Sequence, residues 1–217
     1  MLLLLSVSLS LLSAFWFKAE IPKFATRINQ QIYQEVNSIN RLGLSERQFI
    51  AQSALKPKQT KWANLFFLLF PLIMYCSESP MLGGIFILLC FLSILDICYY
   101  LTDTRYIGII FLLVLWESLH SFHNETLLFT ILFCLFIALF SVLIFKRETF
   151  GSGDMLLLVA LSPLFDIEKM LLLILIACLL GIFYYFVYWW IKKQKLEKLA
   201  FIPFISLAMT IVVMLES

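Results

Sequence analysis

Eight apolar runs are the feature that most constrains how this chain can fold. A helix needs about 20 apolar residues to cross a bilayer, and several of the runs reach that length, although 154–165 is short. Of the 217 residues, 62% are hydrophobic and 14% are charged, whereas soluble domains are about 45–50% apolar and about 25% charged. We therefore predict an all-α polytopic membrane helix bundle with about eight transmembrane helices, in one domain over residues 1–217. The expected spans are 1–17, 62–76, 81–101, 105–119, 125–145, 154–165, 168–191 and 199–215.

The sixteen lysines and arginines orient these spans. If all eight cross, fifteen of the basic residues fall on one side and only Lys169 falls on the other. By the positive-inside rule the fifteen mark the cytoplasmic side, which includes the long loop 18–61, and both termini lie outside. A re-entrant loop at 154–165 would send the basic cluster at 192–198 outside, so we count 154–165 as a span. Residues 1–17 have no basic segment before them and no small-x-small cleavage site, so we expect an uncleaved first helix.

Two acidic residues stand apart from those in the loops. Asp96 lies inside the apolar run "FILLCFLSILDICYYL", where an ionisable group is costly and is a functional candidate by default. Asp154 opens the sixth run at its cytoplasmic end, so the predicted topology puts both carboxylates at one depth and on one side. Two carboxylates that approach closely cannot both ionise at neutral pH. One then keeps a proton while the other acts as a general base on water, which is the arrangement of aspartic proteases.

The segment "FGSGDMLL" around Asp154 allows two interpretations. Gly151 and Gly153 carry no side chains, so a substrate backbone or a neighbouring helix can approach closely. Alternatively, the segment is a flexible turn in which Asp154 caps a helix N-terminus, where a carboxylate is favoured. The segment alone leaves the two evenly balanced, and Asp96 at matching depth favours catalysis.

Three segments resemble the type IV prepilin peptidase family of GxGD intramembrane aspartic proteases. "GSGDMLLLVALSPLF" (151–165) resembles the GxGD motif and the helix that follows it. "SILDICYYLTDTRYIGI" (93–109) resembles the segment of the first aspartate, and "FIPFISLAM" (201–209) is similar to the Pro-Phe segment of the last helix. The resemblance implies that Asp96 and Asp154 are the catalytic pair, one from each motif, and that Gly151 and Gly153 are the motif glycines.

The resemblance also implies an activity and its partners. The expected reaction is removal of a short basic leader from prepilin or pseudopilin precursors on the cytoplasmic side of the bacterial plasma membrane. The nearest members are the small enzymes of Gram-positive competence and pseudopilin systems, and neither a cofactor nor a nucleic-acid partner is implied. Some members are also N-methyltransferases and carry paired CxxC motifs in the first cytoplasmic loop. Residues 18–61 contain no cysteine, so we do not expect that second activity.

Two other functions stay open from the sequence. One is a GxGD protease that acts on other membrane substrates, although "LDICYY" does not match the catalytic helix of those relatives well. The other is a transporter or assembly protein without enzymatic activity, with Asp96 as an ion or proton site. Paired repeats with broken helices would favour a transporter, and the sequence contains no internal repeat.

Three smaller features complete the predictions. His120 and His123 have the i, i+3 spacing that suits a metal, but we expect them in a loop on the outer side, away from the aspartates, and predict no metal site. Asp103 either orients substrate or caps the turn after the third run, and we expect the cap. The loop 18–61 is expected to hold an amphipathic helix at the membrane surface, either simply solvated, which we favour, or in contact with substrate leaders or lipid headgroups.

Overall fold

The computed structural model describes residues 2–39, 45–119, 121–146, 151–194, 196 and 198–215, with the side chains of residues 2–6 and 145 left aside. Throughout this part of the chain the regular elements are helices, which confirms the predicted all-α class. The contacts divide the chain into two compact units, Met1–Cys76 and Ser77–Ser217. The helices are α1 (Leu2–Ile39), α2 (Glu46–Gln52), the 3-10 helix η1 (Lys61–Leu65), α3 (Phe66–Cys76), α4 (Pro80–Tyr99), α5 (Thr104–Glu117), α6 (Asn124–Phe145), α7 (Ser152–Leu161), the 3-10 helix η2 (Ser162–Leu164), α8 (Ile167–Lys192) and α9 (Ile202–Met214).

The first unit is built on α1, which packs along α3 and also contacts α2. The helix does not end at Phe17, where the apolar run ends, but continues to Ile39 with Pro22 inside it. Phe17, Ile21 and Phe24 are buried at helical spacing and extend one packed face past the end of the run. The segment expected as the loop 18–61 therefore begins with about six further turns of helix.

A polar contact ties the end of this loop back to α1. Asn29 is 1% exposed. Its Nδ2 donates a hydrogen bond to the carbonyl oxygen of Leu55 at 2.8 Å, and its Oδ1 accepts one from Ser53 Oγ at 2.6 Å. Because both polar atoms of the buried amide are satisfied, the contact holds the returning segment beside the helix.

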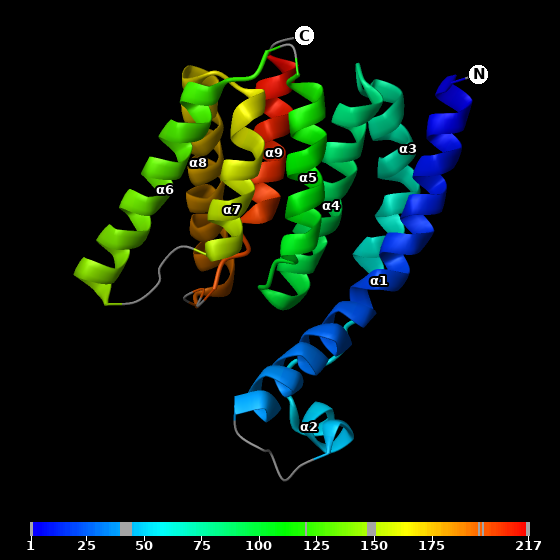
Figure 1. The fold of residues 1–217 in the computed structure, drawn as a ribbon, viewed down its shortest axis with the longest axis vertical. Coiled ribbons are helices and arrows are strands. Elements are labelled where there is room, and N and C mark those ends of the chain that lie inside the picture. The colour runs from blue at the N-terminus through cyan, green and yellow to red at the C-terminus, as the bar shows by residue number, and fades with distance from the viewer. Residues whose placement is uncertain are drawn as a thin grey trace. The chain divides into compact units, whose positions relative to one another are not determined.

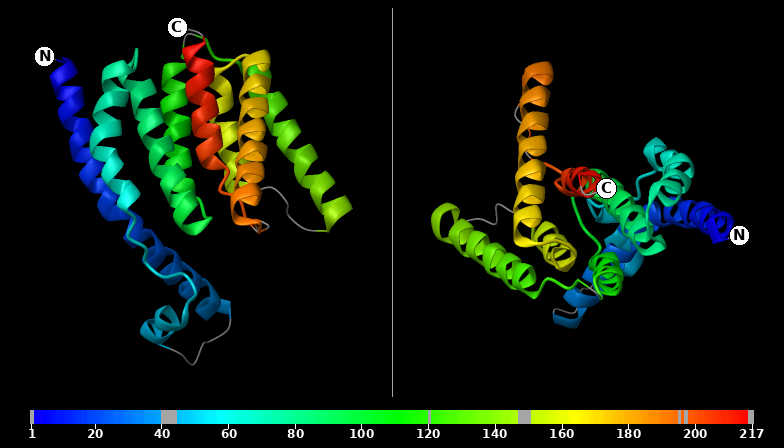
Figure 2. Two further views of the ribbon diagram at one scale, coloured as in Figure 1. Left: turned by 180° about the vertical axis from the view of Figure 1, so that it is seen from behind. Right: turned by 90° about the horizontal axis from the view of Figure 1, so that it is seen from above.

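The second unit is a bundle of six helices, α4 to α9, that alternate in direction (Figure 1). Within it α4 packs against α5 and α9, α5 also packs against α7, and α8 packs along α9. Figure 2 shows the same helices from behind and from above. In the most apolar window of α4, 61% of the residues are buried, against 17% in α6 and 22% in α8. Of these three helices, α4, which carries Asp96, is the most buried, and α6 and α8 leave most of their apolar side chains uncovered.

Three of the described helices are long and apolar enough to cross a membrane, namely α4, α6 and α8. The other apolar helices are shorter. In particular α7 has 10 residues, which at 1.5 Å per residue is about 15 Å, half the hydrocarbon thickness of a bilayer. A membrane helix bundle is the architecture that this composition supports, and the number of eight crossings stays a prediction.

Most of the described basic residues of this bundle lie at one of its ends. Because the helices alternate, the end of α4, the start of α5 and the end of α8 meet at the same end of the bundle as the start of α7 (Figure 1). Arg105 and Lys192 lie there, and Lys169 lies at the opposite end, in the first turn of α8. We call this end the Asp96 end, after the acid in the last turn of α4. Arg41, Arg147 and Lys195, which also entered the charge count, lie outside the described residues.

Candidate active site

The end of α4 and the turn that follows it position Asp96. The Asp96 side chain is buried, and the residue is 6% exposed. Tyr100 ends the helix in the left-handed conformation, with φ 54°, and its N–H donates to the Asp96 carbonyl oxygen at 2.8 Å. Asp103 then begins α5, since its Oδ1 accepts a hydrogen bond from the Arg105 N–H at 3.1 Å. The prediction that Asp103 caps this turn is confirmed.

The start of α9 supplies hydrogen bonds to the Asp96 carboxylate. The N–H of Ile202 donates to Asp96 Oδ2 at 3.1 Å, across 106 positions of sequence. The N–H of Phe201 also interacts with this carboxylate. The first N–H groups of a helix have no partners inside it and carry a partial positive charge, so they stabilise an anion. The segment 201–209 thus contributes backbone hydrogen-bond donors to Asp96. The sequence did not reveal this contribution.

The start of α7 positions Asp154. Gly151 is the N-cap residue and makes no side-chain cap, and Asp154 lies in the first turn with its N–H donating to the Gly151 carbonyl oxygen at 3.1 Å. Asp154 is therefore not the residue that caps the helix. Its carboxylate folds back over Gly151, where an added Cβ would lie 2.7 Å from Asp154 Oδ2. In the described part of the chain, no hydrogen bond reaches this carboxylate, unlike that of Asp96.

The second motif glycine brings α7 against the turn after α4. A Cβ added at Gly153 would lie 2.6 Å from both the Cβ and the Oγ1 of Thr102, so only a glycine allows this approach. Thr102 lies in the short turn between α4 and α5. The carboxylates of Asp96 and Asp154 are close enough to interact electrostatically. The structure therefore brings together the four residues singled out from the sequence and adds Thr102, for which the sequence carried no signal.

A small cavity adjoins this site. It has a volume of about 220 Å³ and lies beside the residues that follow Asp96 and Ile202. Its walls are mainly apolar and aromatic, and the rings of Tyr184 and Phe204 lie 5.7 Å apart. The other lining residues are Ile97, Tyr100, Leu196, Lys198, Leu199, Ala200 and Pro203. Such a cavity can accept an apolar side chain next to the acids.

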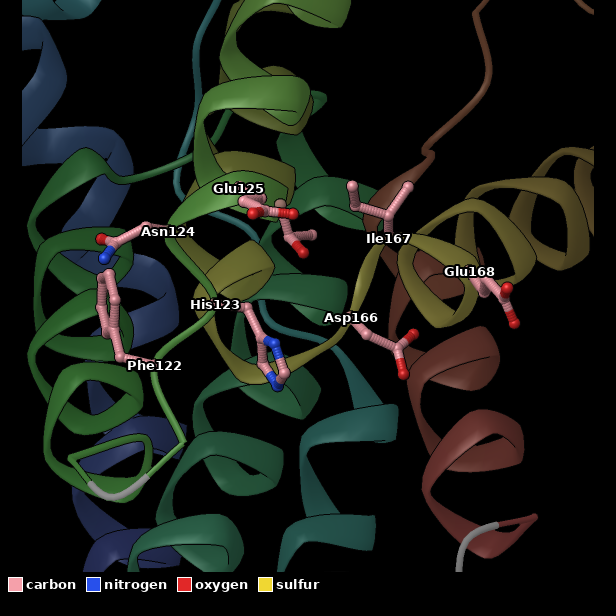
Figure 3. Close-up of a pocket in the computed structure, with 8 residues that line it drawn as sticks. Phe122, His123, Asn124, Glu125, Asp166, Ile167 and Glu168 are labelled. Carbon is pink, nitrogen blue, oxygen red and sulfur yellow. The ribbon is translucent and has the colours of Figure 1, made fainter.

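The segment that carries His123 lies at the end of the bundle opposite the two aspartates. His123 precedes α6, and its N–H donates to the carbonyl oxygen of Pro163 at 3.4 Å, which places it at the opposite end of α7 from Asp154. It lines a pocket with Glu125, Asp166 and Glu168, and Figure 3 shows their carboxylates spread around the pocket instead of converging. No group of three metal-binding side chains is found among the described residues. His120 lies outside them.

The chain matches a known family over this region. Residues 84–186 match the model of the type IV leader peptidase family, and this range contains both Asp96 and Asp154. Over this region, a little under half of the chain, the protein is similar to the type IV leader peptidase family. The resemblance inferred from the sequence is thereby confirmed at the level of the family. No curated protein and no solved structure gives a match.

The family match covers only part of this chain. The first unit, Met1–Cys76, and the helix α9 lie outside residues 84–186. The Pro-Phe resemblance at 201–209 is therefore not part of the match. Its link to the site in this structure is the hydrogen bond from Ile202 to Asp96.

Proposed function

We propose that this protein is a leader peptidase, an aspartic endopeptidase that uses Asp96 and Asp154 as its catalytic pair. The observation that carries the proposal is the contact between Gly153 and Thr102, which holds the start of α7 against the turn that follows α4. Two acids from distant parts of the sequence thereby share one end of the bundle. Aspartic proteases need this arrangement, a pair of carboxylates of which one holds a proton.

The hydrogen bonds to the two carboxylates indicate which aspartate acts as the base and which holds the proton. The Asp96 carboxylate accepts hydrogen bonds from backbone N–H groups at the start of α9, and these hydrogen bonds stabilise the anion. Asp154 has no such donors among the described residues, so it is the acid that holds the proton. Asp96 takes a proton from the attacking water while Asp154 gives its proton to the carbonyl oxygen of the substrate. When the tetrahedral intermediate collapses, the C–N bond breaks and the leaving nitrogen receives the proton from Asp96. Asp154 takes back a proton from one of the two hydroxyl groups of the intermediate, so that the product is a carboxylic acid and both aspartates return to their starting states.

The proposed substrates are prepilin-like precursors, which carry a short basic leader before an apolar helix. Arg105, Lys192 and Lys193 lie at the Asp96 end, which supports a cytoplasmic position for this end by the positive-inside rule. The same rule keeps the basic leader of a precursor in the cytoplasm, next to the two acids. The cavity of about 220 Å³ then receives an apolar side chain from the start of the substrate helix. The proposed location is the bacterial plasma membrane.

Cleavage of a prepilin-like precursor by the purified full chain in proteoliposomes tests this function. Asp96→Asn and Asp154→Asn are each expected to lower the rate of cleavage by about 10²–10⁴-fold while the protein stays folded in the membrane. Asp103→Asn is the matched control, since Asp103 is a buried acid at the same end and asparagine caps a helix as well as aspartate does. Cleavage at the wild-type rate in either of the first two variants would refute the catalytic pair, and an equal loss in all three would show that the substitution disturbs the bundle.

A further inference from the structure

The first unit contains a cavity of its own, between α1 and the segment that leads into α3. Its volume is about 660 Å³. Its polar lining comes from Lys18 on α1 and from Gln59, Thr60, Lys61 and Asn64 on the other side. Phe15, Ile21 and Pro22 contribute apolar walls. All of these residues belong to Met1–Cys76, so the cavity is formed within one unit.

The charge of this cavity is positive. Lys18 and Lys61 line it, and its lining includes no acidic residue from the part of the chain that the structure describes. The acid nearest to Lys18 in sequence, Glu20, is 7% exposed and forms an ion pair with Arg27. Its charge is therefore already balanced elsewhere. Two ammonium groups and three neutral polar side chains make a lining that suits an anion with several oxygen acceptors.

The position of the cavity points to the membrane surface. Lys18 directly follows the apolar run 1–17, and Lys61 directly precedes the run 62–76. Packing of α1 along α3 brings the two ends of these runs together. Trp16 and Trp62 are 54% and 67% exposed beside them, and tryptophan is enriched where a helix leaves the hydrocarbon of a bilayer.

We propose that this cavity binds the phosphate of an anionic phospholipid headgroup. Lys18 and Lys61 contact the phosphate oxygens, and the amide and hydroxyl groups of the lining hydrogen-bond to the rest of the headgroup. A free phosphate ion shares the charge but would leave the apolar wall around Phe15 without a partner. An acyl chain covers that wall, since Phe15 is 65% exposed and belongs to the apolar run. The proposal concerns the first unit alone and does not depend on the catalytic pair.

Native mass spectrometry of the detergent-solubilised full chain tests this site. The protein is titrated with phosphatidylglycerol and, separately, with phosphatidylcholine of the same acyl chains. We expect tighter binding of phosphatidylglycerol, and a loss of about 30-fold in the double variant K18Q/K61Q, because each lysine near a headgroup contributes a factor of about five. The double variant K192Q/K193Q removes the same charge at the end of α8, outside the cavity, and is expected to bind as the wild type does.

Three results would overturn the proposal. Equal losses in the two double variants would show a general effect of net charge and no site. Equal binding of the two lipids by the wild type would show that the anionic headgroup is not recognised. A third arm adds glycerol 3-phosphate as a soluble competitor: we expect no displacement at millimolar concentration, and displacement there would assign the cavity to a soluble phosphate compound instead of a lipid.

Discussion

The substitution Gly153→Ala tests how the two acids are held together. The added Cβ would lie 2.6 Å from the Cβ and Oγ1 of Thr102, whereas carbon atoms pack at about 3.5–4.0 Å. The start of α7 must therefore move away from the turn by about 1 Å, and Asp154 moves with it. A misplacement of about 1 Å costs a reaction about 100-fold in rate. The overpacking itself costs about 1–3 kcal/mol, which leaves a protein of ordinary stability folded.

The assay is the initial rate of precursor cleavage in proteoliposomes, with thermal unfolding measured on the same samples. Gly108→Ala is the matched control, since a Cβ at this position on α5 meets no atom within 4 Å. The clash can also be relieved from the other side. Thr102→Gly removes all three atoms that the new Cβ would meet, so it should restore most of the rate to Gly153→Ala, whereas Thr102→Ala keeps the Cβ contact and should not.

The reasoning fails if Gly153→Ala cleaves at the wild-type rate, because the close approach would then have no bearing on the acids. It also fails if Thr102→Ala restores the rate as well as Thr102→Gly does. That result would mean that the contact between the two Cβ positions is not the one that displaces α7.

Three further predictions concern single contacts. In Gly151→Ala the new Cβ would lie 2.7 Å from Asp154 Oδ2, so the carboxylate must turn away; we expect cleavage to fall with little change in thermal stability. Asn29→Ala removes two hydrogen bonds from a buried site, about 1–3 kcal/mol, and should increase limited proteolysis of the adjoining loop, unlike Gln34→Ala on the exposed face of α1. Phe204→Ala widens the cavity of about 220 Å³ and should raise the KM for precursor more than it lowers kcat.

The helical class and the approximate positions of the helices could be predicted from the sequence because apolar runs are a local property. The runs at 81–101 and 168–191 correspond to α4 and α8 within a few residues. The end of the first helix could not be predicted in this way. Apolar composition stops at Phe17, but the helix continues to Ile39, since hydrogen bonding along a helix does not require apolar residues.

Part of the candidate site could likewise be predicted from the sequence, and part of it could not. Asp96 and Asp154 could be assigned to one end of the bundle because alternating helices and the distribution of lysine and arginine fix the ends of each helix. The hydrogen bond from Ile202 to Asp96 could not be predicted, since no periodic pattern links residues 106 positions apart. The contact of Thr102 with Gly153 is a matter of packing between a turn and a helix, which sequence spacing does not encode.

A double-mutant cycle tests the catalytic pair most directly. The kcat/KM for precursor cleavage is measured for the wild type, Asp96→Asn, Asp154→Asn and the variant with both substitutions. Groups that act as one catalytic unit are not additive. We predict that each single substitution lowers kcat/KM by about 10²–10⁴-fold and that the double variant is no slower than the slower single one. A double variant slower by the product of the two separate effects, or a single variant with wild-type activity, would contradict the shared role of Asp96 and Asp154.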